Sequence, residues 1–296
     1  MLLNKYVEKS GLPRIVHPKS PPLKMQGIKT KIVPLIAQSI SWEENGRWIE
    51  PFLGTGVVAL NIAPQNAVLA DTNEHVINLY QGILNEEIKG CTVRNHLEHE
   101  GSLLLEKGEC HYYAIRERFN EFGDPLDFIF LNRSCFNGMV RFNRKGKFNV
   151  PFCRKPERFR PALVTKIVNQ VEWVTTVMKG KNWKLIVQDW RKTISEAKEG
   201  DLIYCDPPYV GRHTDYYNGF TEEDANELAN ALHSTSAKFV MSMWLENKYR
   251  KNEYVERWFT DFPQRTISHF YHVGATEKLR NQMTEVLILS RDAAAG

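Results

Sequence analysis

Four consecutive residues combine an acid, two prolines and an aromatic ring. The short apolar run of residues 201–206 is typical of a buried strand. It ends in Asp206 and is followed by Pro207, Pro208 and Tyr209. Each proline fixes its own φ angle and lacks an N–H donor, so nearby carbonyls remain as acceptors in a rigid turn. A carboxylate and such a carbonyl offer the two acceptors that an NH2 group requires. The stretch predicts a seat for the exocyclic amine of a nucleobase, with Tyr209 stacked on the ring.

A second stretch that could bind a ligand is the glycine turn Gly54-Thr55-Gly56, which joins a strand-like run to a helix. Glycine allows a tight turn, and the first N–H groups of a helix are free for a polar ligand. The third glycine of the dinucleotide pattern is missing, which disfavours a nicotinamide dehydrogenase. Asp71 ends the next strand-like run, where doubly wound folds hold a ribose diol. An adenosyl ligand without phosphates is predicted, and S-adenosylmethionine fits.

Glu50 ends the strand that precedes the glycine turn. Two interpretations of this acid stay open. Its carboxylate could face the ammonium group of the cofactor, or it could be an exposed acid at the end of a strand.

These residues are expected to share one edge of an α/β fold. Strand and helix patterns alternate, which indicates a mostly parallel, Rossmann-like sheet covered on both faces, with its carboxyl ends at one edge. About a dozen residues join the last two strands, too few for a crossover helix, so a C-terminal antiparallel hairpin is expected. The candidate strands are 47–52, 66–71, 183–189, 201–206, 237–244, 265–271 and 284–290, and the candidate helices are 30–40, 55–63, 74–83, 161–178 and 221–234.

The second and third candidate strands are separated by far more residues than a parallel crossover needs. We therefore expect a discontinuous catalytic domain made of residues 1–73 and 182–292, with residues 74–181 inserted as a helical subdomain. The last residues of the chain are left out of this fold.

The distribution of charge indicates a polyanionic partner. The formal net charge is only +4, yet residues 132–160 carry nine Lys and Arg against one acid. Residues 1–31 carry seven Lys and Arg against one acid. Clustered cations are what contacts with phosphates require, although a solvated surface loop would explain either run alone.

The composition also bears on the compartment of the protein. Five cysteines are scattered without a CxxC pair, which indicates reduced thiols and neither a disulfide framework nor a zinc site. No apolar run is long enough to span a membrane, and the N-terminus lacks the apolar core of a signal peptide. A cytoplasmic protein is expected.

The motifs together resemble one enzyme family. "DPPY", "EPFLGTG", "ADTN" and the N-terminal "KMQGIKTK" occur in the order seen in the Dam-like, alpha-class DNA adenine-N6 methyltransferases. The segment "FLNRSCFNGMVRFNRKGKFNVPF" (130–152) resembles the target-recognition segment of that family. Within the family, the overall likeness is greatest to a modification enzyme that acts on GATATC. The sequence departs from the family at Met25 and at Gly27-Ile28, where an aromatic residue and a Gly-Gly pair are usual, so stacking of Met25 on the cofactor stays open.

The resemblance implies an enzyme that methylates the N6 amine of a flipped adenine in duplex DNA with S-adenosylmethionine and without a metal. A prokaryotic or phage origin, a place at the nucleoid, and a GATATC or related GAT site are implied too. The enzyme would either accompany a separate cognate restriction endonuclease or act as an orphan.

The implied catalytic residues are Asp206, Pro207, Pro208 and Tyr209. The implied cofactor-binding residues are Met25, Lys29, Glu50, Phe52, Gly54, Gly56, Asp71, Asp189 and Asp206. The implied DNA-binding residues are Lys24, Arg133, Phe136, Asn137, Met139, Arg141, Asn143, Arg144, Lys145 and Lys147, the basic ones on a hairpin at about 132–155.

Two alternatives stay open. One is a cytosine-N4 or RNA adenine methyltransferase, because related acidic Pro-Pro-aromatic turns occur in both. The other is a non-catalytic DNA-binding module that retains a cofactor fold. In either case, residues 210–220 lack apolar periodicity and are expected to form a loop that closes over the nucleic acid.

Overall fold

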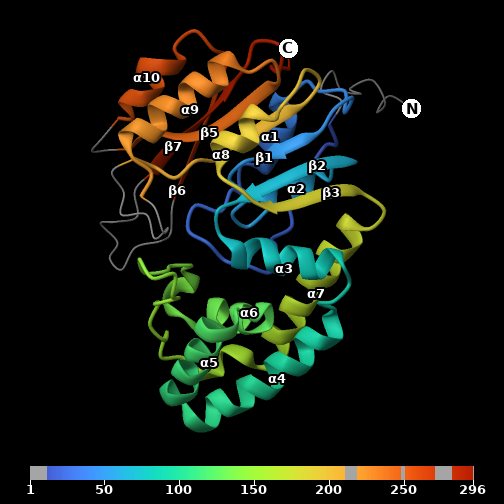
Figure 1. The fold of residues 1–296 in the computed structure, drawn as a ribbon, viewed down its shortest axis with the longest axis vertical. Helices are drawn as coiled ribbons and strands as arrows, with labels where there is room; N and C mark the ends of the chain where they lie inside the picture. Colours follow the sequence, from blue (N-terminus) through green and yellow to red (C-terminus); the bar gives the residue numbers. More distant parts are fainter. Residues whose placement is uncertain (1–11, 211–218, 248–250, 271–281, 296) are drawn as a thin grey trace.

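The computed structural model describes residues 12–210, 219–247, 251–270 and 282–295. A single sheet of seven strands lies at one end of the molecule, and a helical part lies at the other (Figure 1). Most of the predicted closing loop, residues 210–220, falls outside the described residues. Within the described part of the chain, no helix combines the length and the apolar character needed to cross a membrane.

The sheet has the order β3-β2-β1-β4-β5-β7-β6. Five strands run parallel, and β7 lies antiparallel between β5 and β6. The strands are β1 (Trp48–Glu50), β2 (Asn66–Asp71), β3 (Asn182–Val187), β4 (Leu202–Cys205), β5 (Lys238–Asn247), β6 (Gln264–Phe270) and β7 (Gln282–Leu289). The α/β class and the antiparallel C-terminal pair are therefore confirmed.

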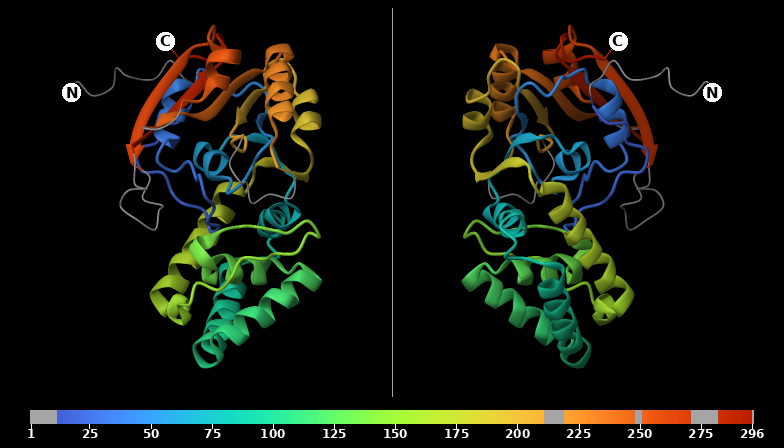
Figure 2. Two further views of the ribbon diagram at one scale, coloured as in Figure 1. Left: turned by 90° about the vertical axis from the view of Figure 1, so that its left-hand side faces the viewer. Right: turned by 90° about the vertical axis from the view of Figure 1, so that its right-hand side faces the viewer.

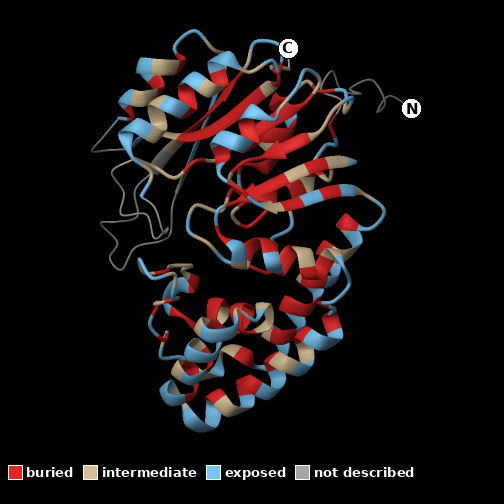
Figure 3. Cartoon of the chain, in the orientation of Figure 1, coloured by how far each residue is buried: buried red, intermediate tan, exposed pale blue. Residues whose placement is uncertain are grey.

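Helices cover both faces of the sheet because successive strand residues point to opposite sides. Trp48 and Tyr204 join the core beneath α1 (Val33–Ser39) and α2 (Val57–Ile62), whereas Ile49 and Ile203 join the core beneath the helices of the other face. Those helices are α8 (Trp190–Ser195), α9 (Glu222–Ser234) and α10 (Glu253–Phe259). In Figure 3 the central strands are buried along most of their length, whereas the edge strand β3 also carries exposed residues.

The long connection between β2 and β3 forms the helical part. It contains α3 (Glu74–Leu84), α4 (Gly90–Lys107), α5 (Glu109–Phe122), α6 (Pro125–Ser134) and α7 (Pro161–Met178), with short 3-10 turns at Phe136–Gly138 and Pro156–Phe159. The side views place these helices together at one end of the molecule (Figure 2). One continuous apolar core nevertheless joins them to α1 and α2 of the sheet part.

Two buried acids and their partners hold three of these helices together. Arg118 on α5 donates to Asp127 on α6 with Nε–Oδ2 and Nη2–Oδ1 distances of 2.7 and 2.6 Å. Its Nη2 also lies 2.8 Å from Oε1 of Glu100 on α4, whose other oxygen is 2.7 Å from His111 Nε2. Because each buried acid has a hydrogen-bonded partner, the arrangement fixes the helices relative to one another.

The end of the described chain differs from the expectation that the fold stops at 292. Ala293 is fully buried, and its carbonyl accepts the N–H of Ser41 at 2.8 Å. The N–H of Ala295 donates to the carbonyl of Ser39, also at 2.8 Å. The small side chains fit beside the end of α1, so residues 293–295 belong to the folded part.

Candidate active site

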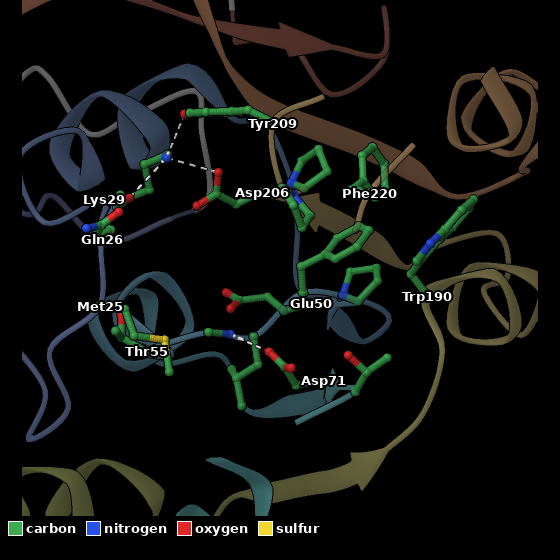
Figure 4. A pocket seen from close by; sticks show the side chains of 18 of the residues that line it. Met25, Gln26, Lys29, Glu50, Thr55, Asp71, Trp190, Asp206, Tyr209 and Phe220 are labelled. Carbon is green, nitrogen blue, oxygen red and sulfur yellow. Dashed lines mark hydrogen bonds and ion pairs between the residues drawn. The ribbon is translucent and has the colours of Figure 1, made fainter. Parts of the chain in front are cut away.

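The carboxyl edge of the sheet carries a cavity of about 330 Å³. Its walls come from the N-terminal segment, the ends of β1, β2 and β4, the start of α8, and the loop after α6 (Figure 4). The cavity brings together most of the predicted chemistry, because parallel strands end at the same edge. The predicted residues that line it are Met25, Lys29, Glu50, Phe52, Gly54, Asp71, Met139, Asp189, Asp206, Pro207, Pro208 and Tyr209.

Asp206 lies at the end of β4 and is gripped on one oxygen. Its Oδ1 is 3.0 Å from Lys29 Nζ and 3.1 Å from the hydroxyl of Ser242 on the neighbouring strand β5. Burial raises the pKa of this carboxyl, and the ammonium of Lys29 opposes that rise. About a quarter of the side chain is exposed toward the cavity. Both described partners reach Oδ1, so Oδ2 is available to a ligand.

Lys29 forms a cluster with Asp206 and Tyr209, a placement that the sequence did not predict. Its ammonium donates to the Tyr209 hydroxyl at 3.2 Å and lies 5.4 Å from the centre of the Tyr209 ring. Burial raises the pKa of Tyr209 to about 12. The lysine therefore sits between the carboxylate and the phenol, and it favours the charged form of Asp206.

Glu285 on β7 is a further acid that sequence reasoning missed. It is buried, and its Oε1 lies 4.0 Å from Lys29 Nζ. The only signal in the sequence is an acid at the start of the apolar run "EVLILS". That signal has meaning only once β7 lies next to β5, because this pairing brings Glu285 opposite Trp244 near the cluster.

Glu50, whose surroundings were left open, is a buried acid of the cavity wall. Its Oε1 accepts the indole N–H of Trp48 at 2.9 Å. Burial raises the pKa of the carboxyl to about 8, and the indole hydrogen bond only partly offsets this. The interpretation as an exposed strand-end acid is wrong, and a cationic group beside this carboxyl would favour its ionised form.

The glycine turn is held from within the protein. Gly54 N–H donates to Asp71 Oδ2 at 2.8 Å, and Gly56 N–H donates to the carbonyl of Leu53 at 2.8 Å. The N–H groups of the two glycines are therefore used within the protein, and helix α2 begins after them, at Val57. Gly56 caps α2 with φ of 66° and does not line the cavity. Asp71 also accepts from Asn73 N–H, but a carboxylate keeps further lone pairs for two hydroxyls.

Apolar side chains form two walls of the cavity. The ring of Phe52 stacks against Trp190, with centroids 6.1 Å apart, and meets Phe220 edge-on at the same distance. Met25 packs above the glycine turn, since a Cβ on Gly54 would lie 3.9 Å from its sulfur. Asp189 lies at the rim, where its side chain caps α8 by accepting Arg191 N–H. Such walls suit a flat aromatic ring.

The predicted recognition residues lie on an antiparallel loop after α6. Isolated antiparallel β-bridges pair the backbone of Cys135 with that of Phe152, and the backbone of Phe142 with that of Phe148. Phe136 is 51% exposed, and Asn137 adopts a left-handed conformation with φ of 55°. Arg141 Nε donates to Asn149 Oδ1 at 2.9 Å. The tip of the loop is ordered by Asn143, whose side chain accepts backbone N–H groups, and exposes Arg144, Lys145 and Lys147.

Two predicted DNA-binding residues occupy other positions. Lys24 lies beside the loop with an exposed side chain. Arg133 turns inward, where it donates to the carbonyl of Pro22 and to Gln170 Oε1, and burial lowers its pKa to about 10. In this structure Arg133 ties the N-terminal segment to α7, so the placement does not support its predicted role as a DNA reader.

Comparisons with known proteins agree with this geometry. The family model of D12 class N6 adenine-specific DNA methyltransferases matches residues 26–278. A DNA adenine methylase of Serratia marcescens is 29% identical over 255 residues, covering 82% of this chain and 88% of the relative. The type II methyltransferase M1.LlaDCHI of Lactococcus lactis subsp. cremoris is 28% identical and covers 90% and 93%. A DNA adenine methylase of Vibrio cholerae is 30% identical and covers 76% and 80%.

A mostly parallel sheet carries a cavity, a glycine turn and an Asp-Pro-Pro-Tyr turn at its carboxyl edge. This arrangement is consistent with a Rossmann-like methyltransferase, a class of enzyme that uses S-adenosylmethionine. The chain belongs to the D12 class N6 adenine-specific DNA methyltransferases. The Dam-like resemblance is thereby confirmed.

Proposed function

We propose that the chain transfers the methyl group of S-adenosylmethionine to the N6 amine of an adenine that has left a DNA duplex. The observation that carries the proposal is Asp206, held at the mouth of the cavity by Lys29 and Ser242 on the oxygen Oδ1. The other oxygen then accepts one hydrogen of the amine, and the Pro207 carbonyl accepts the second. Tyr209 supplies the stacking face for the base.

The cofactor fits the residues of the cavity by volume and by charge. About 330 Å³ lies in the range of small-molecule sites. Phe52 and Met25 cover a ring, Asp71 accepts ribose hydroxyls, and Glu50 faces a cationic group. When bound, S-adenosylmethionine supplies a methyl group on a positively charged sulfur.

The residues promote transfer by position and charge. An adenine amine is a poor nucleophile because its lone pair is delocalised into the ring. Two fixed acceptors favour a pyramidal nitrogen whose lone pair faces the methyl group. The N–CH3 bond forms as the S–CH3 bond breaks, and the nitrogen then loses one proton to water or to Asp206. Moving the base out of the duplex costs a few kcal/mol, which stacking on Tyr209 offsets.

Binding of the cofactor should release a proton near neutral pH, and Glu50 should be its source. Without a cationic neighbour this carboxyl is largely protonated at pH 7, because burial raises its pKa to about 8. A cationic ligand favours the ionised form. Calorimetry of S-adenosylhomocysteine binding at pH 7, in buffers of different ionisation enthalpy, should show nearly one proton released by the wild type and almost none by Glu50→Gln.

The same substitution should stabilise the protein without ligand. A carboxyl whose pKa is raised on folding binds more protons in the native state, so stability falls as pH rises from about 4.5 to 8. At pH 7 the penalty from Glu50 amounts to about 3 kcal/mol at most, which Glu50→Gln would remove. A lower melting temperature of Glu50→Gln at pH 7, or unchanged proton release, would contradict this account.

The loop after α6 is proposed to read the DNA. Phe136 is exposed and apolar enough to enter the space left by the flipped base. The next residues of the loop are proposed to contact neighbouring base pairs, namely Asn137, Met139 and Arg141. The exposed basic residues at the tip of the loop contact phosphates, which position the protein without specifying sequence.

Arg141→Ala should relax recognition at one base pair by about 1–3 kcal/mol. In the free protein Arg141 rests on Asn149, so binding would exchange this contact for a guanine. Methylation rates on a substrate series with single-base changes would measure the effect. Lys145→Ala is the matched control, and it should weaken binding to all sequences alike. Equal losses on cognate and altered DNA for Arg141→Ala would show that Arg141 touches only the backbone.

Several finer features rest on the sequence resemblance. We propose a GATATC or related GAT-containing target from the likeness to the EcoRV modification methyltransferase. A cognate restriction endonuclease, a cytoplasmic location and a place at the nucleoid are proposed on the same ground. Residues 74–181 are proposed to act as the target-recognition subdomain, because the exposed basic loop lies within them.

The proposed reaction can be tested with purified protein and methyl-labelled cofactor. The protein is incubated with duplex DNA or with RNA, and the products are digested to nucleosides. Labelled N6-methyldeoxyadenosine from DNA alone is the expected product. Label on N4-methyldeoxycytidine or on RNA would favour the alternative methyltransferases, and no label at all would favour a non-catalytic module. Sequencing modified genomic DNA from expressing cells then gives the target site.

A further inference from the structure

One buried side chain joins the cofactor cavity to the DNA-reading loop. Asn132, in the last turn of α6, is 0% exposed. Its Oδ1 accepts the N–H of Lys24 at 2.9 Å, and its Nδ2 donates to the carbonyl of Lys24 at 2.8 Å. The same Nδ2 donates to the carbonyl of Gly138 at 3.2 Å. Both amide hydrogens are therefore used, on segments that lie on either side of α6 in the sequence.

The two segments that Asn132 joins both reach into the cavity. Lys24 precedes Met25, and Gly138 precedes Met139, and both methionines line the cavity wall. A side chain that fixes the backbone at Lys24 and Gly138 thus fixes the position of both methionines. In Figure 4, Met25 lies beside the glycine turn, on the side of the cavity where the proposed cofactor would bind.

A second observation at this junction is independent of the hydrogen bonds. A Cβ on Gly138 would lie 3.0 Å from both Cβ and Cδ of Lys24, and 3.4 Å from the backbone oxygen of Asn132. Gly138 also has φ of 66°, which disfavours a larger residue. The loop thus lies in direct contact with the N-terminal segment, with no space for a methyl group between them.

Another asparagine provides a natural comparison. Asn120 on α5 makes the same kind of paired contact, accepting Phe148 N–H at 2.7 Å and donating to the Phe148 carbonyl at 3.2 Å. It anchors the tip of the loop to the helical part. These contacts do not reach the N-terminal segment, so a substitution of Asn120 would affect the anchoring of the loop without removing a contact to the cofactor wall.

We propose that Asn132 is a positioning residue that couples cofactor binding to DNA recognition. It holds the Lys24–Met25 segment and the Phe136–Met139 turn in one register. When specific DNA fixes the conformation of the turn, Asn132 also fixes the wall of the cofactor cavity. Because coupling between two binding sites is reciprocal, a bound cofactor likewise favours the conformation of the turn that binds DNA. The inference rests on the proposed function, because it requires that one cavity serve the cofactor and that the adjacent loop serve DNA.

The test measures affinity for S-adenosylhomocysteine without DNA and with a duplex that contains the mapped target site. Without DNA, each of two variants should weaken binding roughly tenfold. Asn132→Ala removes three buried hydrogen bonds to Lys24 and Gly138, and Gly138→Ala adds a methyl group for which the contact with Lys24 has no space. Asn120→Ala should stay within about twofold of the wild type, because its contacts lie on the loop alone. Melting temperatures confirm that each variant folds.

With saturating duplex, the wild type should bind S-adenosylhomocysteine more tightly than it does without DNA. Asn132→Ala should lose most of this gain in affinity, whereas Asn120→Ala should keep it. Unchanged affinity without DNA in both Asn132→Ala and Gly138→Ala would overturn the inference, as would an undiminished gain with DNA in both. If one variant fails to fold, the other decides. Product analysis of the wild type tests the proposed function separately, since methylation can occur whether or not the two ligands are coupled.

Discussion

Asp206→Asn should lower the rate of methyl transfer about 100- to 1000-fold, as expected when a fixed polar group that acts on the reacting atoms is lost. The amide keeps the shape of the side chain but loses the charge that pairs with Lys29 at 3.0 Å. The amide can also turn its own NH2 group toward the amine of the base. Two hydrogen-bond donors would then face each other, and the amine would lose an acceptor. Single-turnover rates with saturating cofactor and DNA isolate this step from binding.

Two comparisons make the result specific. Ser242→Ala removes one neutral hydrogen bond of 3.1 Å to Asp206 Oδ1, so its rate should fall only about two- to tenfold. Affinity for S-adenosylhomocysteine should change far less than the rate in Asp206→Asn. A rate close to that of the wild type in Asp206→Asn would exclude Asp206 as the acceptor for the amine.

Tyr209→Ala should lower turnover about 100-fold, because stacking of a base on an aromatic ring contributes about 1–3 kcal/mol. Loss of the ring leaves the everted base without its stacking face, while most of the cofactor wall stays intact. The measurement is the single-turnover rate on a duplex that contains the mapped site, together with affinity for S-adenosylhomocysteine.

Tyr209→Phe is the matched control for the ring. It keeps the stacking surface and removes only the hydroxyl that lies 3.2 Å from Lys29 Nζ. Its rate should therefore stay within about tenfold of the wild type. If Phe and Ala were equally damaging, the contribution of Tyr209 would come from its bond to Lys29, and the proposed stacking role would be wrong.

The sheet could be predicted from the sequence because apolar runs bounded by turn residues are strong local signals. All the expected strands are present, with ends that differ from the predicted ones by at most three residues. Helix 161–178 was predicted to the residue, and Thr221 caps α9 as expected. The position of β7 between β5 and β6 depends on contacts between segments that are distant in the sequence, and no local sequence pattern predicts it.

The site shows the same division between local and distant information. The grouping of Glu50, Asp71 and Asp206 follows from one rule, that parallel strands end at the same edge. The partners of these acids depend on tertiary packing. The family resemblance implies a cofactor contact for Lys29, yet its ammonium contacts Asp206. Glu285 lies near the same ammonium on the antiparallel strand β7.

Local sequence was not sufficient at two further positions. Arg133 belongs to a basic stretch that predicts DNA contact, but α6 turns it toward Gln170 and the N-terminal segment. For Glu50 the sequence left a buried and an exposed position open, and the structure buries its carboxyl next to the indole of Trp48. Side-chain direction and tertiary packing decide both cases, and residue type alone encodes neither.

The most direct test of the central claim is a crystal structure with sinefungin, a cofactor analogue, and a duplex that contains the mapped site. The account predicts one adenine outside the helix, with its N6 within hydrogen-bond distance of Asp206 and of the Pro207 carbonyl and its ring over Tyr209. The analogue should lie between Met25 and Phe52. An adenine that remains stacked in the duplex, or one bound away from Asp206, would contradict the account.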